Sequence, residues 1–194
     1  MLRIIGGDWK GRGLKSPKGH EARPTLGRVR EAVFSIIEED IAGARVLDLF
    51  AGAGALGFES LSRGAESCVF VDRRHASVAL IAQSARALDC ADRVKALKAE
   101  LPGALAKESV AKAAMANGAF DVVLMDPPYE RGLVSGVLEA LVERGWLAPE
   151  AVVVVETRRG ETFAIPEGLQ PTKSKTYGDT EVRFFVNCVS GESW

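Results

Sequence analysis

The sequence has little cysteine and little histidine. Its three cysteines, Cys68, Cys90 and Cys188, lie far apart, so they form neither a Cys-x-x-Cys pair nor an even set for disulfides. Cys68 and Cys188 fall in apolar, strand-like runs, where we expect buried thiols. The two histidines, His20 and His75, have no partners at the spacing of metal ligands. The sequence therefore favours neither a disulfide scaffold nor a metal site.

Long hydrophobic runs are also missing. No apolar stretch approaches the roughly 20 residues that a membrane-spanning helix needs, and the N-terminus lacks the apolar segment of a secretory signal. The composition, 47% hydrophobic and 26% charged in 194 residues, is typical of a globular protein with one substantial core. We therefore expect a cytoplasmic protein without membrane contact. With no apolar stripe left over, we expect a monomer.

The net charge is only −1, but the charges are unevenly distributed. Residues 1–30 contain eight Lys or Arg and two acidic residues, so the rest of the chain is acidic. A basic segment on an acidic body favours a polyanionic partner. The glycines around Trp9 predict a hairpin that displays cations and an aromatic ring, a surface that can follow phosphates and stack on a base. Trp9 could equally be an anchor that packs this hairpin onto the rest of the protein. We predict a basic β-hairpin appendage over residues 1–22 and one domain over residues 23–194.

Strand and helix signals alternate through that domain. Apolar runs predict strands at 45–50, 67–71, 94–98, 120–125 and 152–156. Helical spacing and helix-forming composition predict helices from about 25, and at 55–63, 74–88, 101–116 and 133–144. Such alternation is typical of a parallel, doubly wound sheet. Residues 173–177 and 181–189 alternate around a Gly-Asp turn and predict an antiparallel hairpin at its edge. The predicted fold class is α/β, a Rossmann-like sandwich with a mostly parallel seven-stranded sheet.

The most informative motif is Asp126-Pro127-Pro128-Tyr129, which directly follows the predicted strand 120–125. It therefore lies at a strand's carboxyl end, where open α/β sheets bind ligands. The prolines fix φ, remove two backbone donors and hold the preceding residue extended. The turn presents acceptors, namely the Asp126 carboxylate and a carbonyl of Asp126 or Pro127, beside the flat ring of Tyr129. An ordinary proline-rich turn is the alternative, but this surface suits a planar amine.

A glycine-rich turn at residues 52–57 follows the first predicted strand and satisfies G-x-G-x-x-G, with Asp72 near the position of the later acid. Alone it suggests a dinucleotide site, yet a nucleoside with an amino-acid tail can use the same backbone. Asp72 is placed to accept hydrogen bonds from two ribose hydroxyls. Asp48 either orders the turn through backbone NH groups or faces a cationic part of the ligand. An enzyme that transfers hydride does not need the Asp126 motif, whereas an enzyme that transfers a methyl group from S-adenosylmethionine to an exocyclic amine does.

Several blocks together resemble one family. They are Arg3-Ile4-Ile5-Gly6-Gly7 with Lys10-Gly11-Arg12, Arg23-Pro24-Thr25 with residues 28–34, Asp48 through Gly57 with Glu59 and residues 62–65, the Asp126 motif and, more weakly, residues 177–180. Spread over nearly the whole chain, they resemble the bacterial 16S ribosomal RNA (guanine-N2)-methyltransferases. Two positions depart from the family pattern: Gly27 stands in place of a polar or acidic residue, and Ala53 replaces a serine.

This resemblance implies a class I methyltransferase fold and S-adenosylmethionine as donor. The acceptor would be one guanine of 16S rRNA, within the 30S subunit or an assembly intermediate. Carried over by position, the resemblance implies cofactor contacts at Asp48, Gly52, Gly54, Asp72, Glu100, Thr25 and Arg28. Ala99 is an alternative to Glu100 near the adenine. Residues 126–129 would be catalytic, and RNA contacts are expected at Arg3, Trp9, Lys10, Arg12, Lys15 and Arg23.

Two other functions stay open. A DNA adenine-N6 methyltransferase uses the same acceptor chemistry but usually carries a target-recognition domain, for which this chain has little room. A ribosome-binding module that holds the cofactor without catalysis is the other alternative. The intact Asp126 motif and glycine turn argue against it.

Overall fold

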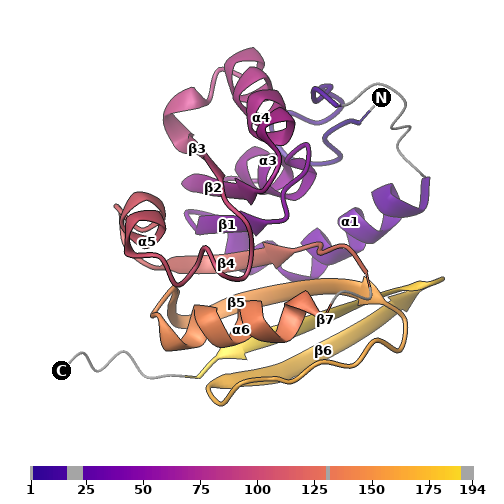
Figure 1. Ribbon diagram of the computed structural model, residues 1–194. Helices are drawn as coiled ribbons and strands as arrows, with labels where there is room; N and C mark the ends of the chain where they lie inside the picture. The colour runs from indigo at the N-terminus through magenta and orange to yellow at the C-terminus, as the bar shows by residue number, and fades with distance from the viewer. Residues whose placement is uncertain (1, 17–23, 130–131, 189–194) are drawn as a thin grey trace.

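A seven-stranded sheet forms the centre of the structure (Figure 1). The computed structural model describes residues 2–16, 24–129 and 132–188. The strands are β1 (Arg45–Leu49), β2 (Ser67–Asp72), β3 (Val94–Lys98), β4 (Phe120–Met125), β5 (Leu147–Arg158), β6 (Leu169–Tyr177) and β7 (Thr180–Asn187). They lie in the order β3-β2-β1-β4-β5-β7-β6.

Strands β1 to β5 are parallel, whereas β7 runs antiparallel to β5 and β6. This arrangement confirms the predicted α/β class, the mostly parallel sheet and the C-terminal hairpin. From β1 the chain builds outward to β2 and β3 on one side and then returns to β4 on the other. The carboxyl ends of β1 and β4 therefore flank the point where the strand order reverses, which is where sheets of this kind hold their ligands.

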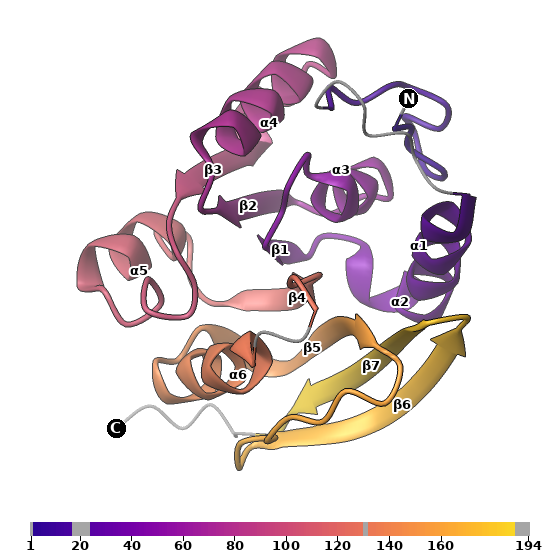
Figure 2. The ribbon, with the colours of Figure 1, turned by 45° about the vertical axis from the view of Figure 1, so that its right-hand side comes forward.

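Helices cover both faces of the sheet (Figure 2). Their bounds are α1 (Pro24–Ile36), α2 (Glu38–Ile41), α3 (Ala55–Ser62), α4 (His75–Ala87), α5 (Glu108–Ala114) and α6 (Leu133–Glu143), with a 3₁₀ turn at Ala91–Arg93. Helices α1 to α4 pack on one face and α5 and α6 on the other. On α6 the buried residues recur at helical spacing, at Val134, Val137, Leu138 and Leu141, so one side of the helix meets the sheet.

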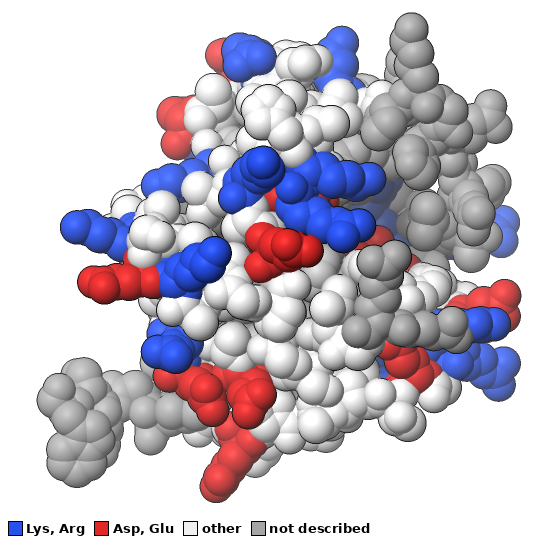
Figure 3. Space-filling view, in the orientation of Figure 1, with Lys and Arg blue, Asp and Glu red and all other residues white. Residues whose placement is uncertain are grey.

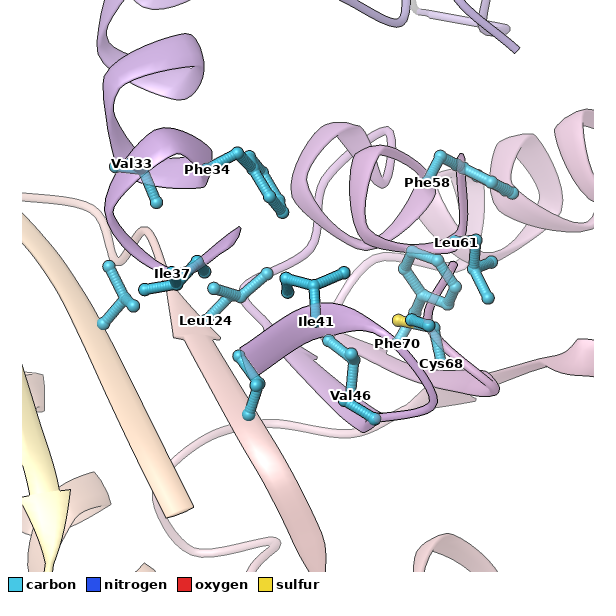
Figure 4. Close-up of a cluster of buried hydrophobic side chains, with 14 of the residues drawn as sticks. Val33, Phe34, Ile37, Ile41, Val46, Phe58, Leu61, Cys68, Phe70 and Leu124 are labelled. Carbon is cyan, nitrogen blue, oxygen red and sulfur yellow. The ribbon is translucent and has the colours of Figure 1, made fainter. Parts of the chain in front are cut away.

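Because successive side chains of a strand point to opposite faces, the strands supply two separate cores. The first core, between the sheet and helices α1 to α4, contains Val46, Phe70 and Leu124 from the strands. Figure 4 shows these residues together with Phe34 of α1 and Phe58 of α3. The second core lies against α5 and α6 and takes the alternate strand residues, Leu47, Val71, Val123 and Val153 among them.

Two expectations were wrong. The helix predicted at 101–116 begins only at Glu108, since Pro102 and Gly103, both poor helix formers, lie in turns that precede it. Cys68 is buried as expected, but Cys188 is exposed because β7 ends at Asn187, one residue before it.

The basic N-terminal segment folds back on itself and lies beside α3 and the end of α4 (Figure 2). Within residues 2–16 there is one isolated antiparallel bridge, Arg3 to Gly13, rather than a regular two-stranded ladder. Backbone hydrogen bonds such as Ile4 N to Arg12 O, at 3.0 Å, close the loop. The segment is therefore an irregular hairpin. The predicted domain boundary at 22/23 lies outside the described residues.

A buried carboxylate on α3 attaches this segment to the domain. Glu59, fully buried, accepts hydrogen bonds from Ile5 N at 2.9 Å and Gly6 N at 2.7 Å. It also pairs with Arg63 Nε at 2.9 Å and Arg30 Nε at 3.5 Å. Two backbone donors and two guanidinium groups thus depend on a single side chain, so its removal would leave several polar groups without partners.

We predict that Glu59→Ala lowers the free energy of unfolding by about 3–5 kcal/mol, the usual cost of removing one partner from a buried ion pair. Urea unfolding would measure this loss, and hydrogen exchange should show faster exchange at the amides of Ile5 and Gly6. The matched control is Glu31→Ala on exposed α1 surface. Equal stability of the two variants would contradict the anchoring role of Glu59.

Candidate active site

Three carboxylates meet where β1, β2 and β4 end. Asp48 lies in β1, Asp72 is the last residue of β2, and Asp126 directly follows β4. The parallel register pairs Asp48 with Phe70 of β2 and with Leu124 of β4, so the three acids lie at the same edge of the sheet. Asp48 is close enough to the other two for both negative charges to raise its pKa. The structure thus brings together the acids that the sequence singled out separately.

Asp48 orders the start of α3. Its side chain is 2% exposed, and its Oδ2 accepts a hydrogen bond from Gly57 N at 2.9 Å. Burial raises the pKa of Asp48 to about 7, with further contributions from Asp126 and Asp72, whereas the Gly57 NH opposes this rise. No ion pair with a described residue compensates the charge of Asp48. A cation placed beside this carboxylate would favour its ionised form.

Asp72 holds the glycine turn. Its Oδ2 accepts from Gly52 N at 2.9 Å, and its Oδ1 accepts from Arg74 N at 2.8 Å. Gly52 and Gly54 adopt φ angles of 56° and 80°, which favour glycine over other residues. A Cβ on Gly54 would lie 3.0 Å from the rings of Phe58 and Phe70, so the turn is packed against the first core as well.

Tyr129 is fixed through its hydroxyl group. The phenol donates to Glu156 Oε1 at 3.3 Å and lies 3.3 Å from Thr180 Oγ1, with which it shares a further hydrogen bond. Glu156 and Thr180 are buried in β5 and β7, whereas Tyr129 itself is 40% exposed. The ring is thus held at its polar end and leaves apolar surface open to a ligand.

Asp126 and Glu156 form a closely spaced acid pair. Asp126 reaches solvent at the surface, but the protein around it limits hydration and raises its pKa. Burial, and then the charge of Asp126, raise the pKa of Glu156. Two such groups do not ionise independently, and the more buried Glu156 is the one that keeps its proton more readily. Asp126 is then the carboxylate that faces the open side of the site.

Glu156 and Thr180 are site residues that the sequence did not identify. Glu156 follows four consecutive valines, 152–155, and a carboxylate directly after such an apolar run is itself a signal. Thr180 belongs to the weakest of the blocks, residues 177–180. What could not be read from the sequence is that the antiparallel pairing of β5 with β7 brings both residues to Tyr129.

A hollow of about 460 Å³ opens beyond the ends of β2 and β3. It is lined by Arg73, Arg74, Lys98, Ala99, Glu100 and Lys107. Both alternatives for the adenine contact, Ala99 and Glu100, therefore border the same space. Glu100 is exposed, whereas Ala99 is half-buried and packs against the second core.

The residues expected to contact RNA differ in their surroundings. Trp9 is half-buried against the first core, and the Arg93 guanidinium lies 5.6 Å from its ring centroid, which favours the anchor interpretation. Arg12 Nη2 donates to Ala87 O at 2.5 Å, and Arg3 Nη1 donates to Gly11 O at 2.7 Å. These two guanidinium groups thus contribute to the fold.

The remaining predicted residues are only partly described. Lys10, Lys15 and Arg28 are exposed. Arg23 and the side chain of Thr25 lie outside the described residues.

Within the described part of the chain, no group of three or more His, Cys, Asp or Glu side chains could hold a metal ion. None of the helices in those ranges combines the length and apolar character needed to cross a membrane.

The raised pKa of Asp48 makes stability depend on pH. In the unfolded chain this carboxyl has a pKa near 3.9. Below that pH, the preference of the folded protein for protonated Asp48 contributes its full amount to the free energy of unfolding. This contribution is lost as the pH rises through about 7. Asp48→Asn keeps an acceptor for Gly57 and cannot ionise. We predict that its free energy of unfolding falls less between about pH 5 and about pH 8 than that of the unaltered protein.

Urea unfolding at a series of pH values would measure this difference. Glu139→Gln, on the exposed side of α6, is the control and should leave the pH profile unchanged. Parallel profiles for Asp48→Asn and the unaltered protein would show that Asp48 is not the group responsible.

Known proteins resemble this chain over nearly its whole length. The family model described as conserved hypothetical protein 95 matches residues 2–186. Ribosomal RNA small subunit methyltransferase D of Escherichia coli K12 is 34% identical over 100% of this chain and 93% of its own length. The Haemophilus influenzae protein of the same name is 33% identical over 96% and 94%.

Solved structures give the same result. The Escherichia coli protein yhhF superposes with a TM-score of 0.84 and 30% identity, covering 97% of this chain and 99% of that one. These matches confirm the resemblance to small-subunit rRNA methyltransferases drawn from the sequence blocks. The chain belongs to the family described as conserved hypothetical protein 95, and its relatives of matching length are named ribosomal RNA small subunit methyltransferase D.

Proposed function

We propose that this protein transfers a methyl group from S-adenosylmethionine to the exocyclic N2 amine of a guanine in 16S rRNA. The observation that carries the proposal is the placement of the Asp126 motif. It forms an acceptor-rich turn beside Asp48 and Asp72, at the reversal point of the sheet. The names of the full-length relatives supply the RNA class. The hydrogen-bond acceptors of the turn indicate that the methylated group is an amine.

The residues at the ends of β1 and β2 fit this methyl donor. Asp48 is a buried carboxylate without a compensating ion pair among the described residues, and S-adenosylmethionine carries two cationic groups. Asp72 has lone pairs left for ribose hydroxyls after its two backbone hydrogen bonds. Gly52 has no side chain to block the approach of a ligand, and a Cβ there would meet nothing closer than 3.8 Å. When bound, the donor supplies an electrophilic methyl group.

Asp126 acts on the amine of the guanine. The lone pair of N2 is delocalised into the ring, which makes this nitrogen a poor nucleophile. Hydrogen bonds from the amine to the Asp126 carboxylate and a neighbouring carbonyl favour a pyramidal nitrogen with its lone pair directed at the methyl group. The same acceptors stabilise the positive charge that develops on nitrogen. Positioning of this kind supplies much of the acceleration. The amine becomes acidic once methylated, so a strong general base is not required.

Tyr129 holds the base. Enzymes that act on a base take it out of its stack and read it in a pocket lined by aromatic or apolar side chains. Because Glu156 and Thr180 hold the phenol, the Tyr129 ring keeps a fixed plane against which an extruded guanine can stack. We place the reaction in the cytoplasm, on a 30S subunit or assembly intermediate, with the protein acting as a monomer.

Asp126→Ala should lower the rate of methyl transfer by at least about 100-fold, because it removes the main acceptor for the developing charge. The affinity for S-adenosylhomocysteine should stay within a few-fold of its original value. Tritiated methyl incorporation into unmodified 30S subunits and calorimetric titration would measure the two quantities. Asp92→Ala, at an exposed position of the 3₁₀ turn, is the control. Full activity of Asp126→Ala would refute the proposed role.

The choice of nucleic acid separates this function from its nearest alternative. We expect methyl incorporation into unmodified 30S subunits or their rRNA, with N2-methylguanine as the product. Duplex DNA should accept no methyl groups under the same conditions. Methylated adenine in DNA would favour the DNA methyltransferase instead. No incorporation into either substrate, with S-adenosylhomocysteine still bound, would favour the catalytically silent module.

A further inference from the structure

A group of cations surrounds the hollow at the ends of β2 and β3. Arg73 and Arg74 follow β2, Lys98 ends β3, and Lys107 directly precedes α5, yet all four line the same space. Figure 3 shows Lys and Arg side chains gathered near the centre of this face, next to acidic ones. Among the described residues of the lining, Glu100 is the one carboxylate. On a chain of net charge −1, this is a local excess of positive charge.

Most of this charge is not neutralised within the protein. Arg74 pairs with Asp72, Nε to Oδ1 at 3.4 Å. In the described ranges, Arg73, Lys98 and Lys107 form no ion pair, and all three are exposed. Unpaired cations around one hollow lower the free energy of a bound anion. Because these side chains are exposed, the anion binds without a large cost of removing water from the cations.

The methyl donor does not account for these cations. The adenosine part expected at the ends of β2 and β3 is uncharged, and the whole donor has two cationic groups against one carboxylate. It carries no phosphate. The cofactor thus offers these cations neither a phosphate nor a net negative charge, and the anion that they suit belongs to the other substrate.

We propose that the exposed side chains of Arg73, Lys98 and Lys107, beside the adenosine and not in its place, bind a backbone phosphate of the substrate RNA next to the methylated nucleotide. This inference rests on the proposed function, since it concerns the same RNA. Only β1 separates β2 from β4, and β3 lies one strand further out, so the hollow at the ends of β2 and β3 lies about 10–15 Å from the Asp126 turn along the sheet edge. An RNA strand whose guanine lies at Tyr129 can therefore reach the hollow with a nearby phosphate. Phosphate contacts of this kind fix the position of a nucleic acid without reading its sequence.

The position also differs from that of the basic N-terminal segment. That segment lies on α3 and the end of α4, where Arg12 contacts Ala87 O. The hollow lies at the β2–β3 edge, beside the start of α5. The hollow is therefore a contact surface for the RNA that is separate from the N-terminal segment.

The double variant Lys98→Gln with Lys107→Gln tests this inference. Its control is Lys173→Gln with Lys175→Gln, two exposed lysines on β6 at the far edge of the sheet. The probe is the unmodified 30S subunit, bound at several salt concentrations. We expect roughly tenfold weaker binding at about 0.1 M salt, and a salt dependence of log K shallower by about 0.7 for each lysine removed. The KM for 30S should rise while kcat is kept.

Two results would overturn the inference. One is a double variant that binds 30S like its control, with the same salt dependence. The other is a loss of S-adenosylhomocysteine affinity in the absence of RNA, in a double variant whose urea unfolding matches that of its control, which would assign the lysines to the cofactor. Failure of the proposed function has a different signature, because the unaltered protein would then methylate no rRNA at all.

Discussion

The parallel register of β1 with β2 and β4 places three carboxylates at one edge of the sheet, and the site depends on how these charges are compensated. Asp72 is stabilised by backbone NH groups of the glycine turn and of Arg74. Asp48 has a single NH, from Gly57, and its pKa is raised to about 7. Asp126 accepts no hydrogen bond and forms no ion pair with a residue in the described ranges that compensates its charge, and it faces the open side. At the same edge, Asp72 thus orders a turn, Asp48 suits a cation, and Asp126 faces the side from which an amine can donate hydrogen bonds to it.

Much of this arrangement could be predicted from local patterns. Apolar runs located the strands, and the residues directly after them, such as Asp72 and Asp126, could be assigned to the carboxyl edge because parallel strands end on the same side. The glycine turn was predictable as well, since positive φ angles at Gly52 and Gly54 need that residue. These are short-range signals. The conformation of each segment is decided by its own sequence.

Other features depend on contacts between distant segments. Tyr129 is held by Glu156 and Thr180, from two strands that pair antiparallel, and no local pattern reports that pairing. The N-terminal segment contains cations that suggested an RNA-binding appendage, and the contacts of Glu59 and the packing of Trp9 that fix it to the domain come from distant segments. The cations around the hollow come from three separate segments. Their convergence became visible only in the folded chain, and it extends the expected RNA surface beyond the N-terminus.

We propose that the protein methylates a guanine of 16S rRNA and that the acceptor turn at Asp126 is required for this transfer. Mass-spectrometric mapping of methylated guanines in 16S rRNA from cells with and without the gene tests it most directly. We expect that one N2-methylguanine is missing without the gene, that the unaltered gene restores it, and that an Asp126→Ala gene does not. An unchanged set of methylguanines in cells without the gene, or restoration by the Asp126→Ala gene, would contradict the account.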